Sequence, residues 1–129
     1  MKQLAAGFFF LLAATFPAQA TGTISCRSSE DAAIQLQLGF VAVDSVIGAY
    51  ITAGASSWST RNDDKATPIA ILQSFIGNGQ LLVDFADDNL ETIIARLRLF
   101  TAESKVDMAT AGTLEIAGVG VYPVVCEGP

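Results

Sequence analysis

Apolar and polar residues alternate through much of the chain, and this period of two is the feature that most constrains the fold. In AAIQLQLGF, the apolar residues Ile34, Leu36 and Leu38 alternate with Gln35 and Gln37. Successive side chains of a β-strand point to opposite faces, so this run predicts a strand with one buried face. The next stretch, SVIGAYITAG, is rich in β-branched residues, which also favour a strand. We therefore expect an all-β protein.

Turn signals separate these runs at nearly even spacing. The clearest is Gly77–Gly79, whose Asn-Gly pair tolerates the positive φ angles of a tight hairpin turn. The segment GASSWST predicts a turn that enters a short strand around Trp58, and Thr60–Pro68 is the longest loop. Eight or nine short strands are typical of a sandwich or a barrel. We expect a small antiparallel β-sandwich that forms a single domain over residues 21–129.

The segment DDNLETIIARLRLFTAES has two interpretations. Its apolar residues fit a helical stripe, but from Ile93 to Leu99 they alternate equally well with Arg96 and Arg98. Because the neighbouring segments are strands, we expect a short helical turn at Asp87–Glu91 followed by a strand at Thr92–Ala102. The two arginines would share the outward face of that strand. There they would pair with carboxylates across the sheet or contact an acidic partner.

The first twenty residues have the features of a secretory signal peptide. A lysine near the start is followed by an apolar run from Leu4 to Phe16 and an A-x-A cleavage site at Ala18–Ala20. The run is shorter than the roughly 20 residues that a membrane-spanning helix needs. We therefore expect residues 1–20 to be removed by cleavage near Ala20. The mature protein would be periplasmic or secreted, without a transmembrane segment.

The only two cysteines, Cys26 and Cys126, lie near opposite ends of the expected mature chain. In an oxidising compartment, an even number of thiols in a small domain usually pairs. We expect a disulfide that joins the first strand to the last. One alternative is lipid attachment to Cys26 in TISC, and another is a redox-active pair, although the spacing is not C-x-x-C.

The charge of the chain indicates which partners it attracts. Cleavage after Ala20 removes Lys2, one of seven basic residues against thirteen acidic ones, so the formal net charge changes from −6 to −7. An acidic domain with scattered basic residues does not attract nucleic acid or anionic lipid. We therefore expect no nucleic-acid partner.

The chain has no histidine, which removes His-based triads, His general bases and most zinc sites. Glycine-rich nucleotide motifs and the G-x-S-x-G motif are also absent. With both cysteines in a disulfide, Met108 is the only soft metal ligand left. We expect a protein that is not an enzyme and has no cofactor, although a hydrolase that uses carboxylates alone remains an alternative.

Carboxylates concentrate in the segment DFADDNLE. Its oxygen-bearing side chains are those of Asp84, Asp87, Asp88, Asn89 and Glu91. Calcium prefers six to eight oxygen ligands, so this segment is a candidate ion site, although its spacing does not match an EF-hand loop. In the alternative, Asp87 or Asp88 caps the following turn and Asp84 points outward from a strand.

Trp58, the only tryptophan, either fills the core or forms a contact surface on the sheet. These features predict an exported, non-catalytic binding module, such as an inhibitor or an accessory subunit of an envelope complex. Its partner would be another envelope or extracellular protein, which could add a strand at an edge near Trp58. The alternative is a module that binds calcium or carbohydrate through Trp58 or through the loop at Asp84–Glu91.

Overall fold

The structure is a computed structural model that describes residues 21–129, so the predicted signal peptide lies outside the described residues. No helix in this part of the chain is long and apolar enough to cross a membrane. The described residues form nine strands, namely β1 (Thr21–Arg27), β2 (Ala32–Gly39), β3 (Ser45–Ala53), β4 (Ser56–Ser59), β5 (Thr67–Gly77), β6 (Gln80–Asp87), β7 (Ile93–Glu103), β8 (Met108–Ile116) and β9 (Gly120–Glu127).

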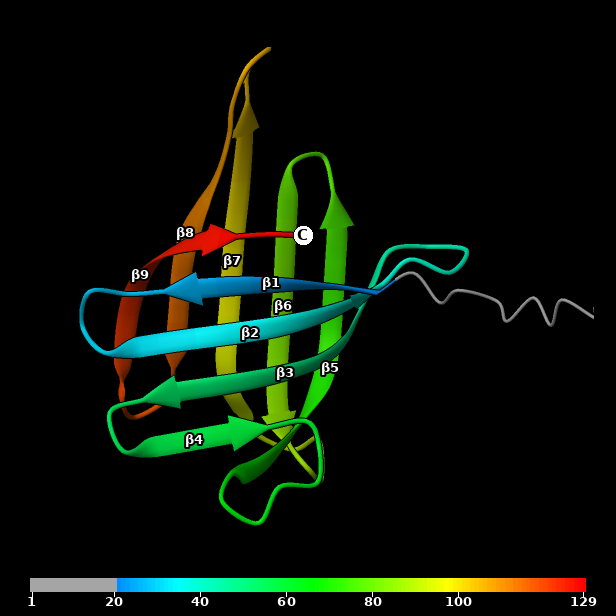
Figure 1. Cartoon of the computed structure of the whole chain (residues 1–129). Helices are drawn as coiled ribbons and strands as arrows, with labels where there is room; N and C mark the ends of the chain where they lie inside the picture. Colours follow the sequence, from blue (N-terminus) through cyan, green and yellow to red (C-terminus); the bar gives the residue numbers. More distant parts are fainter. Residues whose placement is uncertain (1–20) are drawn as a thin grey trace, which may run out of the picture.

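The nine strands form one closed barrel in chain order, so the predicted sandwich is wrong. Each strand pairs with the next, and β9 pairs back with β1. All the pairs are antiparallel except β4 with β5. A sandwich would instead divide the strands between two separate sheets. Figure 1 shows β1–β4 running across the front of the barrel and crossing β5–β8 behind them.

Irregularities in the ladders accompany this closure. The pairing register shifts within β2–β3, within β5–β6 and within β6–β7. Such bulges bend a strand and increase its twist, which lets a sheet curl around a core. Alternation along a strand is the same in a sandwich and in a barrel, so the period of two does not distinguish them.

The inward side chains of the strands fill the barrel with apolar groups. Alternate residues of β2 and β7 are buried, as the period of two predicts. The largest fully buried side chains are those of Phe85, Ile34, Leu36, Ile51, Leu97, Leu99, Leu114, Ile116, Val83, Val124 and Cys26. The barrel is therefore packed with its own side chains.

The connection from β6 to β7 differs from the helical turn expected at Asp87–Glu91. Asp87 ends β6, and its carbonyl accepts a hydrogen bond from the N–H of Leu90 at 3.0 Å. Leu90 has a φ of 60°, in the left-handed region, so a right-handed helix does not pass through it. The predicted helical turn is wrong. The strand expected at Thr92–Ala102 is confirmed, with bounds that differ by one residue.

The predicted hairpin at Gly77–Gly79 is confirmed as the turn between β5 and β6. Asn78 and Gly79 have φ angles of 52° and 70°, and Gly77 pairs with Gln80 across the turn. Positive φ at both central residues suits the right-handed twist of the two strands. The Asn-Gly pair therefore sets the register of this hairpin.

The predicted disulfide between Cys26 and Cys126 is confirmed, and it lies at the seam where the barrel closes. The β1–β9 ladder has only three residue pairs, and the two cysteines form the middle one. The bond joins positions 100 residues apart in the chain. It therefore fastens a short ladder that holds the first strand to the last.

Candidate functional site

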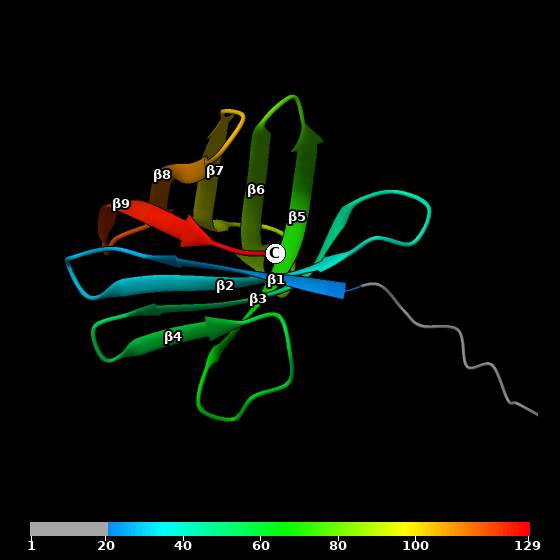
Figure 2. The same ribbon diagram turned by 45° about the horizontal axis from the view of Figure 1, so that its top comes forward.

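One side of β5 lacks a strand partner over most of its length. β5 pairs with β4 only at Thr67 and Pro68, whereas it pairs with β6 as far as Gly77. Within residues 21–129, no strand pairs with β5 beyond Pro68 on the side away from β6. The β5–β6 hairpin projects past β1 in Figures 1 and 2. The outer half of β5 is thus an open sheet edge.

The hairpin register shows which backbone groups of β5 face this edge. In a two-residue hairpin, the pair that flanks the turn is hydrogen-bonded, and bonded pairs then alternate with non-bonded pairs. That pair is Gly77 and Gln80, so the backbone N–H and C=O groups of Ser74 and Ile76 point away from β6. These groups are positioned to bond another extended chain.

A hollow of about 230 Å³ lies on the outer face of the sheet beside this edge. Phe75, Leu82 and Arg98 occupy neighbouring strands in register, and all three line the hollow. The Phe75 side chain stands open to solvent, with 47% of its surface exposed. A chain that pairs with β5 would place every second side chain over this face.

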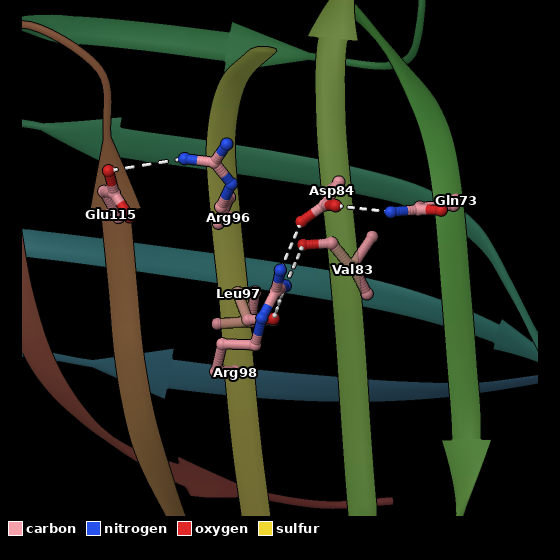
Figure 3. A network of polar contacts seen from close by, with 7 residues as sticks. All are labelled: Gln73, Val83, Asp84, Arg96, Leu97, Arg98 and Glu115. Carbon is pink, nitrogen blue, oxygen red and sulfur yellow. Dashed lines mark hydrogen bonds and ion pairs between the residues drawn. The ribbon is translucent and has the colours of Figure 1, made fainter.

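A buried carboxylate, that of Asp84, is among the groups that line the hollow, and Figure 3 shows its polar contacts. Asp84 is only 6% exposed, and Arg98 Nη2 and Gln73 Nε2 each donate a hydrogen bond to it at 2.7 Å. Arg98 Nη1 also donates to the carbonyl oxygens of Val83, at 3.2 Å, and Leu97, at 2.9 Å. Four hydrogen bonds therefore hold the Arg98 and Gln73 side chains across three strands.

These contacts set the ionisation of Asp84. Burial by itself raises the pKa of the carboxyl, but hydrogen bonds from Gln73 and Arg98 and the charges of Arg98 and Arg96 outweigh it. The pKa of Asp84 is therefore below its ordinary value of 3.8. Because this pKa is lower in the folded state than in the unfolded state, the ionised carboxyl stabilises the fold at pH values above the unfolded-state pKa. That contribution is lost as the pH falls through the folded-state pKa.

The Arg98→Met variant is expected to lower the free energy of unfolding by about 1–2 kcal/mol at neutral pH, because it leaves the buried Asp84 carboxylate without its charged partner. This loss is smaller than that for a fully buried ion pair, because the Arg98 side chain is 35% exposed and water screens its charge. Urea denaturation measures the difference, which should shrink below about pH 4 as Asp84 takes up a proton.

Arg96→Met is the matched control. Arg96 pairs with Glu115 at 3.6 Å, and the two side chains are 42% and 46% exposed, so its loss should stay within about 0.5 kcal/mol. Equal losses for the two variants would show that the Asp84–Arg98 contact contributes no more than an exposed ion pair.

The predicted ion-binding residues do not come together around one point. Asp84 is engaged by Arg98, while Asp87 Oδ1 accepts hydrogen bonds from the backbone N–H groups of Glu91 and Thr92 at 2.8 and 3.2 Å. Asp88, Asn89 and Glu91 lie exposed in the β6–β7 connection. Across residues 21–129, no three Asp, Glu, Cys or His residues are grouped as metal ligands.

The predicted contact residues have different roles. Arg96 and Arg98 lie on the outward face of β7 and pair across strands with Glu115 and Asp84. Trp58 is half-buried and packs against the core from β4. Because β4 pairs with both β3 and β5, the edge expected near Trp58 is wrong, and the open edge is on β5 instead.

The sequence contained one signal for this edge. From Ile69 to Gly77, β5 has no charged residue and no proline, the residues that usually protect an exposed edge. The same composition also fits a central strand, so the unpaired side appears only once the strands are placed. Comparisons with known proteins found no matching family model, no matching curated protein and no matching solved structure.

Proposed function

We propose that this protein is an exported, non-catalytic interaction module. It binds an extended segment of another envelope or extracellular protein, which adds a strand to the open edge of β5. The unpaired side of β5 beyond Pro68 is the observation that carries the proposal. Backbone hydrogen bonds supply affinity in this mode, and pockets for alternate side chains supply specificity. An inhibitor or an accessory subunit of an envelope complex would both work in this way.

The surroundings of the edge support a partner of this kind. The uncharged run from Ile69 to Gly77 lets a strand approach without charge repulsion or charge burial. A side chain of the added strand that points to the outer face would meet the exposed ring of Phe75 and the hollow it shares with Arg98. We therefore expect a partner segment with an apolar residue at that position.

The disulfide supports the exported location. The Cys26–Cys126 bond is consistent with an oxidising compartment such as the periplasm or the medium. Proteins in those compartments are the partners that the module would meet.

The Ser74→Pro variant is expected to reduce capture of the partner by about tenfold, because losing one backbone hydrogen bond and adding a ring at the edge costs roughly 1.4 kcal/mol or more. The N–H of Ser74 faces away from β6, so the hairpin keeps its own ladder. Residues 21–129 serve as bait in native envelope extract under non-reducing conditions, and bound proteins are quantified by mass spectrometry.

Ser74→Ala is the matched control, because it shortens the same side chain and keeps the N–H. It should capture the same partner as the wild type. Circular dichroism melting curves establish that both variants are folded. A partner retained equally by the folded Ser74→Pro variant would contradict strand addition at β5, and so would the absence of any protein captured above background.

A further inference from the structure

A second hollow, of about 680 Å³, lies on the outer face of β1–β3. Its floor includes Gln35 and Gln37 from β2 and Tyr50 from β3. One wall is formed by residues 61–65 of the loop between β4 and β5. None of the residues that line it belongs to the hollow beside the β5 edge, so the two surfaces can be tested separately.

The loop that forms the wall is held in place by its own hydrogen bonds. Three hydrogen bonds join Thr60 to Ala49 on β3. The backbone N–H and the Oγ1 of Thr60 donate to the Ala49 carbonyl oxygen at 3.0 and 3.4 Å, and Oγ1 accepts from the Ala49 amide at 2.9 Å. The Arg61 guanidinium donates to Gln37 Oε1 on the floor. Ser57 Oγ donates to the carbonyl of Lys65 at 3.1 Å. The hollow is therefore a preformed groove, which we call the loop groove.

The loop groove presents unengaged polar groups around an aromatic ring. Within residues 21–129, the side chains of Gln35, Tyr50 and Asn62 make no hydrogen bond with another residue, and all three are exposed. Amide side chains offer donors and acceptors together, and a tyrosine adds a hydroxyl and an apolar ring face. A ligand could therefore meet both hydrogen-bonding groups and a flat apolar surface.

The charges that line the loop groove balance. Its two basic residues, Arg61 and Lys65, stand beside two acidic residues, Asp63 and Asp64. Arg61 is also turned toward Gln37. An anionic ligand would meet the two carboxylates, and a cationic ligand would meet the two basic groups. A neutral ligand avoids both penalties.

We propose that the loop groove binds a neutral oligosaccharide. A sugar ring carries hydroxyl groups around its rim that pair with the amides of Gln35 and Asn62. One face of the ring carries C–H groups, which pack on the Tyr50 ring. The volume of the groove lies within the range of small-molecule sites. This site is independent of the protein contact at β5.

The test is a titration of residues 21–129 with maltotriose, cellotriose and N,N′,N″-triacetylchitotriose, followed by amide chemical shifts in NMR spectra. At least one of these neutral trisaccharides should give saturable shifts at residues 61–65 and on the facing residues of β2 and β3. Tyr50→Ala and Gln35→Ala should each weaken that binding, the first by about tenfold, which corresponds to roughly 1.4 kcal/mol.

Phe100→Ala is the matched control, because it removes an aromatic ring that is 53% exposed and does not line the loop groove. It should leave binding unchanged. The proposal is overturned if none of the three sugars gives saturable shifts, or if folded Tyr50→Ala binds as tightly as the wild type. Tighter binding of glucose 6-phosphate than of all three trisaccharides would also overturn it, since that result indicates an anion site. None of these outcomes affects partner capture at β5.

Discussion

Replacing both cysteines by alanine is expected to lower the free energy of unfolding by about 2–5 kcal/mol. In the chain-entropy model, a disulfide that closes a loop of 100 residues contributes about 4.7 kcal/mol by restricting the unfolded chain. Here the bond also holds the β1–β9 ladder, which has only three residue pairs. Without the disulfide, only this short ladder would hold β1 against β9 where the barrel closes.

Guanidinium denaturation of the oxidised wild type, the reduced wild type and the double variant measures this effect. The reduced protein and the Cys26→Ala/Cys126→Ala variant should unfold at similar, lower denaturant concentrations. A reductant should not change the double variant any further, which makes that variant its own control. A double variant as stable as the oxidised wild type would show that the noncovalent ladder closes the barrel by itself.

Gly112→Ala is expected to lower the free energy of unfolding by about 3 kcal/mol or more, at the upper end of the range for overpacking. Gly112 lies on β8 opposite Leu99 of β7. A methyl group there would overlap the carbonyl oxygen of Arg98 and come within 3.0 Å of the Leu99 Cα atom. Both obstacles are backbone atoms, so no side-chain rotation relieves the overlap and the β7–β8 ladder itself has to move.

Gly48→Ala is the matched control, because it makes the same change within another strand. A methyl group at Gly48 would lie 3.4 Å from Gln37 Oε1 and from Thr60 Oγ1, which is ordinary contact with side-chain atoms. Alanine is better suited than glycine to a strand interior, so this variant should lose nothing or gain up to about 1 kcal/mol. Equal stability of the two variants in urea would contradict the close approach of β7 and β8 at Gly112.

Local sequence patterns predicted most of the individual strands. The alternation in β2, the Asn-Gly turn after β5 and the alternating residues of β7 depend on neighbours within a few positions. A strand with one buried face requires alternating apolar residues, and a turn with positive φ angles requires residues such as Asn and Gly, so both can be recognised from a short stretch of sequence. The helical turn expected at Asp87–Glu91 is wrong because the left-handed Leu90 closes a different turn.

The candidate sites were less accessible to prediction because they depend on distant segments. Arg98 and Asp84 were each noted, yet their contact depends on how β6 and β7 pair. The open edge depends on β4 ending after Ser59, and the loop groove depends on residues 61–65 lying beside the outer face of β2 and β3. The sequence of the polar loop between Thr60 and Pro68 does not indicate which strands the loop lies beside.

The sequence by itself determined the all-β class, the positions of most strands and the pairing of the cysteines. Alternation and turn residues act within a single strand or turn, and two cysteines have one way to pair with each other. Only the tertiary structure decided between barrel and sandwich, left one side of β5 open and placed a loop beside Tyr50. Those features follow from bulges and from which strands become neighbours, and alternation along one strand carries no information about either.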